Sequence, residues 1–352
     1  MKIAYVIPGI PQTGPVVVIQ NLVRYLVKQV EKVDVYYLYD VDKPVSFDCE
    51  VHRINYQTPF NFDDYDIVHT HTAKADLYGA IWSWKMKRAK LVTTIHQDTF
   101  ITEKYRIGPF WGPLYVYSWM FLQRLCFDGV IFISRQIRDI YDKYFKGEKT
   151  IIYNGVYCDY STPVNDSFIR DIKMMKAKGL KILGTYALIM KRKGINQVLL
   201  FLKQNNDFGF VVIGDGAEKP NLIKQCQDLG ISDRVLFLPH VPNPYCYLDD
   251  IDIYTMTSYS EAFGLAMVEA ALSQKPIVCS NLPSFHEIFS DDEACFFELD
   301  NITSLSDAIN KAYSNKEILG VKSKVKAERC FTAKINAENH LKYYKTLLKL
   351  KK

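Results

Sequence analysis

Short apolar runs alternate with longer amphipathic stretches along the whole chain. Apolar runs of strand length separated by helical patterns are typical of βαβ units, in which helices connect parallel strands. The alternation therefore predicts an α/β fold built on parallel sheets. The predicted strands are 3–7, 33–39, 67–70, 91–95, 130–133 and 150–153, and then 181–186, 209–213, 235–238, 253–256 and 276–279.

The two series of predicted strands indicate two domains, which is also the expectation for a chain of 352 residues. Between them, residues 157–179 contain Ser, Thr, Pro, Asn and Asp and are predicted to form a linker. We therefore expect a Rossmann-like domain at 1–160 and a second at 179–330. Ligands are expected in a central cleft that two such doubly wound domains face.

The composition excludes several classes of protein. The net charge of +5, from 44 Lys and Arg against 39 Asp and Glu, is spread along the chain and gives no reason to expect a nucleic-acid partner. Eight scattered cysteines, without a C-x-x-C pair, indicate reduced thiols in the cytoplasm. No apolar run is long enough to span a bilayer, so we expect a soluble or peripheral protein.

Two glutamates stand eight residues apart in the segment 258–270. Glu261 is expected in the loop after the strand 253–256, and Gly264 would open a helix that carries Glu269. The free N–H groups at that helix start could bind a diphosphate above Phe263, Gly264 and Leu265. As a bare pair, however, the two glutamates could equally lie on a solvated helix face.

The full string, Ser-Tyr-Ser-Glu-Ala-Phe-Gly-Leu-Ala-Met-Val-Glu-Ala at 258–270, resembles the E-x7-E motif of glycosyltransferase family 4. That motif usually runs E-G-F-G-L-x-x-x-E-A and then G-x-P-V-V, so Ala262 and Gln274 replace glycines. Further similar segments are Asp-Ile-Val-His-Thr-His at 66–71, the strand ending at His96, Ile-Ser at 133–134, Tyr-Asn-Gly-Val at 153–156 and Gly-Asp-Gly at 214–216. The resemblance implies the GT-B fold, with a C-terminal helix at 331–352 crossing back to the first domain.

The same resemblance implies an activity. Members of the family are retaining, metal-independent glycosyltransferases, and the expected reaction moves a hexosyl group from a nucleotide sugar to a glycan or lipid-linked acceptor in bacterial surface polysaccharide synthesis. A UDP-sugar is favoured and a GDP-sugar is possible as the donor; no cofactor and no metal are expected. The alternatives are a sugar-nucleotide 2-epimerase and a non-catalytic sugar-nucleotide-binding protein.

A basic cluster, Lys191-Arg192-Lys193-Gly194, follows the predicted strand 181–186. In the family, G-R-x4-K-G at this place grips the donor diphosphate, and Lys193 matches the lysine while Leu188 stands where the arginine is expected. A cation must stabilise the leaving diphosphate. Lys193 is therefore a predicted catalytic residue, and either Lys191 or Arg192 is expected to compensate for Leu188.

The resemblance assigns roles to the remaining site residues. His96, at the carboxyl end of a predicted strand, is expected with Glu261 at the donor sugar, and His71 is a weaker candidate. Glu269 is expected to accept hydrogen bonds from the ribose. Gly14, in the first loop, is a predicted phosphate contact, and Val241 completes the donor-binding set.

Two other features have structural alternatives. Three D-x-D strings, at 40–42, 64–66 and 250–252, could suggest a metal site, but two immediately precede predicted strands, which favours a structural role. The aromatic stretch 105–127 follows a basic run at 85–90. It could be a buried helix or a peripheral contact with the inner face of the cytoplasmic membrane.

Overall fold

The computed structural model describes residues 1–349, apart from the side chain of Tyr105. The chain divides into two units: unit 1 contains Met1–Val156 and the C-terminal segment from Phe331, and unit 2 contains Tyr157–Cys330. Residues 157–179, predicted as a linker, lie in unit 2 and include the helix α6 (Asp166–Ala177). Residues 350–352, which belong to the predicted C-terminal segment, lie outside the described residues.

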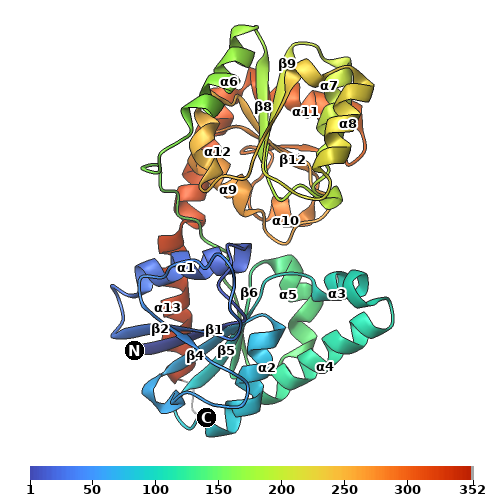
Figure 1. The fold of residues 1–352 in the computed structure, drawn as a ribbon. Helices are drawn as coiled ribbons and strands as arrows, with labels where there is room; N and C mark the ends of the chain where they lie inside the picture. Colours follow the sequence, from blue (N-terminus) through green and yellow to red (C-terminus); the bar gives the residue numbers. More distant parts are fainter. Residues whose placement is uncertain (350–352) are drawn as a thin grey trace. The chain divides into compact units, whose positions relative to one another are not determined.

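Unit 1 is built on a parallel sheet in the order β3-β2-β1-β4-β5-β6-β7 (Figure 1). Its strands are β1 (Lys2–Ile7), β2 (Lys32–Tyr37), β3 (Glu50–Arg53), β4 (Ile67–His71), β5 (Lys90–Ile95), β6 (Gly129–Phe132) and β7 (Glu148–Ile151). Its helices are α1 (Gly14–Leu26), α2 (Ala73–Trp82), α3 (Thr99–Ile107), α4 (Trp111–Cys126), α5 (Arg135–Tyr141) and α13 (Ala333–Lys349).

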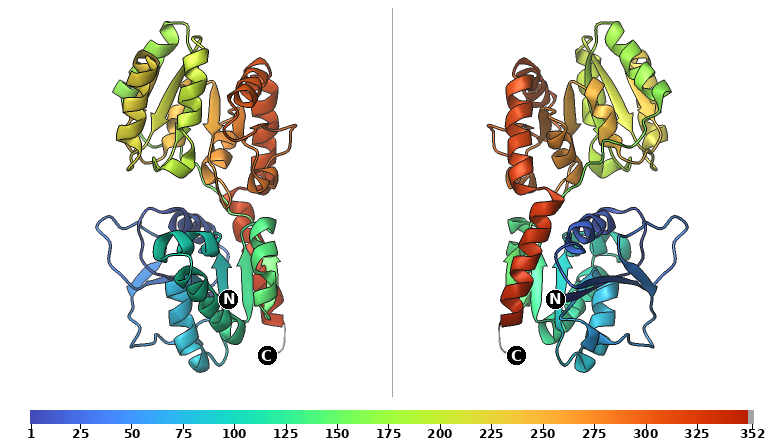
Figure 2. Two further views of the ribbon diagram at one scale, coloured as in Figure 1. Left: turned by 90° about the vertical axis from the view of Figure 1, so that its right-hand side faces the viewer. Right: turned by 90° about the vertical axis from the view of Figure 1, so that its left-hand side faces the viewer.

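Alternating residues of β1 point to opposite faces of this sheet, as the pleat of a strand requires. Ile3, Tyr5 and Ile7 belong to a core cluster with α1 and α13, whereas Ala4 and Val6 belong to a second cluster beneath α2. Both faces of the sheet are therefore covered by helices. Figure 1 and the two views of Figure 2 show α13 running along the sheet of unit 1.

Unit 2 repeats this architecture with a parallel sheet in the order β10-β9-β8-β11-β12-β13. Its strands are β8 (Lys181–Tyr186), β9 (Phe208–Ile213), β10 (Val235–Leu238), β11 (Ile253–Met256), β12 (Ile277–Ser280) and β13 (Cys295–Phe297). Its helices are α6, α7 (Asn196–Gln204), α8 (Lys219–Leu229), α9 (Leu265–Leu272), α10 (Pro283–His286), α11 (Ile302–Ser314) and α12 (Lys316–Cys330). The predicted α/β class with two Rossmann-like sheets is confirmed.

The strand order reverses once in each sheet, between β1 and β4 in unit 1 and between β8 and β11 in unit 2. In open parallel sheets the loops that leave the carboxyl ends of the strands separate at this point and leave room for a ligand. The loops after β8 and β11 contain the basic cluster and the motif with the two glutamates. The fold thus brings together the two segments that the sequence singled out.

Candidate active site

The β8 and β11 loops of unit 2 are held against each other by Gly194. This residue has a φ of +61°, and a Cβ at its position would lie 2.1 Å from the carbonyl oxygen of Thr257. Only glycine accommodates both the left-handed conformation and the close approach. Two hydrogen bonds complete the contact: the Thr257 hydroxyl donates to the carbonyl oxygen of Lys193 at 3.1 Å, and the Tyr259 amide donates to that of Arg192 at 2.8 Å.

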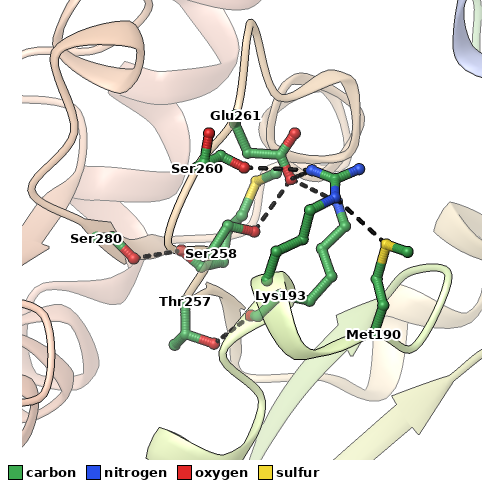
Figure 3. Close-up of polar contacts among 9 residues, drawn as sticks. Met190, Lys193, Thr257, Ser258, Ser260, Glu261 and Ser280 are labelled. Atoms are coloured by element: carbon green, nitrogen blue, oxygen red, sulfur yellow. Dashed lines mark hydrogen bonds and ion pairs between the residues drawn. The ribbon is translucent and has the colours of Figure 1, made fainter. Parts of the chain in front are cut away.

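Lys193 and Glu261 meet at this contact as an ion pair, in which Lys193 Nζ donates to Glu261 Oε1. The Ser258 hydroxyl donates to the same carboxylate oxygen at 3.0 Å. Figure 3 shows the Lys193 and Ser258 side chains directed toward Glu261. Both members of the pair are largely buried, with 17% and 12% of their side chains exposed. Partial burial strengthens such a pair relative to one in water.

Arg192 is a second cation at this carboxylate. Its Nη1 atom lies 3.7 Å from Glu261 Oε1 and donates to the carbonyl oxygen of Ser260 at 3.2 Å. Lys191, the first residue of the same short 3₁₀ helix, is exposed. Leu188, at the position of the family arginine, is 62% exposed. Of the two residues expected to compensate for Leu188, Arg192 is the one that lies beside Glu261.

Helix α9 begins directly after the loop that carries Glu261. Gly264, with a φ of +94°, precedes the helix, and the first bond within it runs from the Met267 amide to the Gly264 carbonyl oxygen at 3.0 Å. The amide groups before Met267 have no partner within the helix, as at any helix start. The predicted diphosphate contacts Phe263, Gly264 and Leu265 therefore lie at the N-terminal end of α9. The Phe263 side chain is buried, so its contribution to a ligand would come from the backbone.

Glu269 lies one turn farther along α9 and faces Tyr186 at the carboxyl end of β8. The Tyr186 hydroxyl is 2.9 Å from both Glu269 Oε2 and the carbonyl oxygen of Ala266. Burial raises the pKa of Glu269 to about 7, and the hydrogen bond from Tyr186 opposes that rise. Near neutral pH this carboxyl group can therefore be neutral or charged. Val241 lies in the loop after β10 and is partly exposed.

The remaining predicted residues belong to unit 1. His71 Nδ1 and His96 Nε2 are 2.7 Å apart at the carboxyl ends of β4 and β5. Burial lowers the pKa of His96 to about 4, so its ring is neutral at physiological pH. Within the described residues, His71 Nε2 is a buried atom without a hydrogen-bond partner. Gly14 is the exposed first residue of α1.

A cavity of about 280 Å³ adjoins His71 in unit 1. It lies at the carboxyl ends of β1 and β4, where the strand order of this sheet reverses. Its walls are mostly apolar, because prolines of the first loop and aliphatic side chains line it. The lining residues are Ile7, Pro8, Gly9, Pro11, Thr13, Pro15, Val16, Ile19, Tyr39, Val41, His71 and Thr72.

Two of the D-x-D strings contain an aspartate with a structural hydrogen bond. Asp66 Oδ2 accepts from the Lys2 amide at 2.8 Å. Asp252 Oδ2 accepts from the Ile182 amide at 2.8 Å, and its other oxygen lies 3.4 Å from Lys316 Nζ. Both residues therefore stabilise the ends of β-strands through hydrogen bonds to backbone amides. Within residues 1–349, one group of three potential metal ligands occurs, Asp34, Glu50 and His52, and its Asp34 is paired with Lys32 at 2.7 Å.

Sequence reasoning missed two polar residues of the site. Ser258 contacts Glu261, and Tyr186 contacts Glu269. Tyr186 ends a strand whose bounds were predicted correctly, and strand ends at a reversal of strand order are where binding groups collect. That position was the available signal. Ser258 lies within the motif itself, three residues before Glu261.

Comparison with known proteins agrees with this geometry. Residues 170–328 match the family model of group 1 glycosyl transferases, and residues 53–160 match that of glycosyltransferase family 4. The chain is 29% identical to the O-antigen biosynthesis glycosyltransferase WclY of Escherichia coli over 99% of both chains. It is 30% identical, over 43% of each chain, to an N-acetylgalactosaminyltransferase of Campylobacter jejuni that acts on a diphospho-undecaprenol substrate.

Solved structures share the fold of the whole chain. The structure of Anabaena HepE in complex with UDP superimposes with a TM-score of 0.81 at 18% identity, over 98% of this chain and 100% of that one. Among residues 1–349, no helix combines the length and the apolar character needed to cross a membrane.

Proposed function

We propose that this chain, which belongs to glycosyltransferase family 4, transfers a hexosyl group from a nucleotide sugar to a hydroxyl group of a glycan or lipid-linked acceptor. A UDP-sugar is the favoured donor, because a protein with the same fold was solved with UDP. Synthesis of a bacterial surface polysaccharide is the favoured setting, because a relative that spans the same length is an O-antigen enzyme. Lipid-linked acceptors would bring the chain to the inner face of the cytoplasmic membrane.

The observation that carries the proposal is the cluster of Lys193, Arg192 and Glu261, in which Glu261 belongs to the loop that leads into α9. We expect these two cations and the N-terminus of α9 to stabilise the negative charge that a diphosphate leaving group gains. The Glu261 carboxylate can accept hydrogen bonds from sugar hydroxyl groups once Lys193 turns to the diphosphate. We expect Glu269, one turn farther along α9, to accept hydrogen bonds from the ribose.

The proposed reaction retains the configuration at the anomeric carbon. The bond from that carbon to the diphosphate oxygen breaks while the acceptor oxygen bonds to the carbon from the same side. The acceptor proton passes to an oxygen of the departing diphosphate, so no protein base is needed. Neutral His96 would contribute hydrogen bonds to the sugar. Stabilisation of the diphosphate falls to Lys193 and Arg192, and we propose that no metal ion takes part.

Two alanine variants test this assignment with a panel of UDP- and GDP-sugars. Glu269→Ala is expected to weaken UDP binding, while Glu261→Ala is expected mainly to lower turnover. Loss of a charged hydrogen bond costs about 1.5 to 3 kcal/mol, or roughly ten- to 150-fold. Unchanged UDP affinity and unchanged kcat/KM in Glu269→Ala would contradict the assignment of Glu269 to the ribose. An epimerised donor as the only product would identify an isomerase, and donor binding without any turnover would identify a non-catalytic protein.

A further inference from the structure

Helix α4 of unit 1 carries a stripe of exposed large apolar side chains. Trp111, Leu114, Tyr117, Phe121 and Leu125 are 63%, 51%, 51%, 60% and 64% exposed. Their spacing of three or four residues places them on one side of the helix. The opposite side, which contains Gly112, Val116, Trp119, Met120 and Gln123, is buried. The exposed stripe therefore forms one face of α4.

The position of α4 is fixed from beneath by Asp76 of α2. The Asp76 carboxylate accepts hydrogen bonds from Trp119 Nε1 at 2.8 Å and from Gln123 Nε2 at 2.7 Å. All three side chains are buried. These two hydrogen bonds hold the buried side of α4 against α2, and the apolar stripe lies on the exposed side.

Neighbouring segments expose further large apolar side chains. Helix α2 packs beside α4 and, with the short helix that follows it, exposes Leu77, Ile81 and Trp84 at helical spacing. Phe110, immediately before α4, is 71% exposed. Figure 2 (left) looks onto the side of unit 1 that carries α3 and α4. We call Leu77, Ile81, Trp84, Phe110 and the five residues of the α4 stripe the apolar face.

Positive charge accompanies the apolar face. Residues 77–126 contain seven Lys and Arg against two Asp and Glu, which equals the net charge of +5 of the whole chain. Of the seven cations, Lys90 is buried in an ion pair with Asp128, and Arg106 pairs with Glu103. The others are exposed: Lys85, Lys87, Arg88, Lys104 and Arg124.

We propose that the apolar face docks on the anionic surface of a lipid bilayer. Trp and Tyr favour the depth of the lipid headgroups, and an apolar helix face with cations beside it binds in the plane of the interface. Each cation near an anionic leaflet adds to the attraction. This inference rests on the proposed function, since an enzyme that acts on lipid-linked acceptors gains access to them by staying at the membrane.

Vesicles of phosphatidylcholine with and without phosphatidylglycerol test the proposal. All four tryptophans, at 82, 84, 111 and 119, belong to unit 1, so intrinsic fluorescence reports on this region. The full chain is expected to float with the phosphatidylglycerol vesicles, with a blue shift of its emission and weaker binding at high salt. Trp111→Ser combined with Phe121→Ser is expected to weaken binding by about tenfold or more, since two large exposed aromatics that would enter the bilayer are lost.

Ile318→Ser combined with Val325→Ser is the matched control, because these residues are 60% and 55% exposed on α12 of unit 2. This variant is expected to bind vesicles as the unchanged chain does. UDP affinity, measured in parallel, is expected to be equal in all three proteins and shows that they are folded. A chain that binds vesicles but not UDP would contradict the proposed function and leave the membrane inference standing.

Several outcomes would overturn the inference. The first is a failure of the unchanged chain to bind phosphatidylglycerol vesicles, and the second is equal binding by the α4 variant. The third is a dimer in solution that the α4 variant converts to a monomer, which would make the apolar face a contact between two copies of the chain.

Discussion

The Tyr186 hydroxyl and Glu269 Oε2 lie 2.9 Å apart, joining the carboxyl end of β8 to the helix that follows the motif loop. The same hydroxyl is 2.9 Å from the carbonyl oxygen of Ala266. Its single proton can serve one acceptor at a time. Glu269 consequently has limited hydrogen bonding to offset its desolvation, and burial raises its pKa to about 7.

The raised pKa predicts a pH-dependent affinity for UDP. Ribose hydroxyl groups donate to the ionised carboxylate, so the protonated form must lose its proton when the nucleotide binds. Below a pKa of about 7, we expect the Kd for UDP to rise toward tenfold per pH unit. Calorimetry between pH 5.5 and 8.5 measures this dependence.

The Glu269→Gln variant is the reference for that experiment, because a phosphate of UDP also titrates near pH 6. Any pH dependence shared by both proteins belongs to the ligand. The excess dependence of the unchanged chain belongs to Glu269. Identical curves for the two proteins would show that the ribose does not select the ionised carboxylate.

Most of the fold could be predicted because apolar runs mark the central strands. All the predicted strands exist, and those at 181–186, 235–238 and 253–256 have the predicted ends, but β3 and β13 were missed. Both are edge strands. β3 reads Glu-Val-His-Arg and has no apolar run, and β13 has only three residues. Edge strands bury less surface, so their sequences carry a weaker pattern.

The sequence predicted the two segments that form the candidate site, but it did not predict the contact between them. Lys193 and Glu261 are separated by 68 residues, and no periodicity encodes such a pairing. It arises because the strand order reverses between β8 and β11 and because Gly194 permits the close approach. The difference between Lys191 and Arg192 depends on the direction of side chains around a short helical turn, which composition does not determine.

Because the Arg192 side chain contacts Glu261 and Lys191 is exposed, we expect unequal effects of alanine substitutions in the basic cluster. Lys193→Ala is expected to lower kcat by about 10² to 10³, the usual loss for a group that stabilises transition-state charge. Arg192→Ala is expected to lower kcat by roughly tenfold or more, the effect of a charged hydrogen bond. Lys191→Ala is the matched control and is expected to stay within about threefold, as a solvated charge would.

Steady-state kinetics with a saturating donor gives the three values, and UDP affinity shows whether each variant is folded. If Lys191→Ala lost as much activity as Arg192→Ala, the assignment of the second cation from the structure would be wrong. If neither variant lost activity, Lys193 would act alone in unit 2 or with a cation from another part of the chain.

Because side chains and a helix N-terminus supply the proposed positive charge, we expect full activity in excess EDTA. Transfer is measured with and without the chelator, after prior dialysis against it. Loss of activity that Mn²⁺ restores would contradict the proposed metal-free mechanism. Loss that no divalent cation restores would point instead to an effect of the chelator on the assay.

The stability of unit 1 depends on the buried carboxylate of Asp76, which accepts hydrogen bonds from Thr70, Thr93, Trp119 and Gln123. Burial raises the pKa of Asp76 to about 6, so the folded state favours the protonated form. The contribution of this group to the free energy of unfolding is therefore greatest at low pH and falls as the pH rises through 4 to 6. Asp76→Ala leaves buried donors without a partner and is expected to destabilise unit 1 by about 3 kcal/mol or more.

The difference in unfolding free energy between Asp76→Ala and the unchanged chain should be larger at pH 5 than at pH 8, since one pKa unit corresponds to about 1.4 kcal/mol. Urea unfolding followed by tryptophan fluorescence reports on unit 1 alone, because all four tryptophans lie there. The exposed Asp63 provides the control, and Asp63→Ala should change stability little at either pH. A difference for Asp76→Ala that is equal at both pH values would mean that the Asp76 pKa is not raised in the folded state.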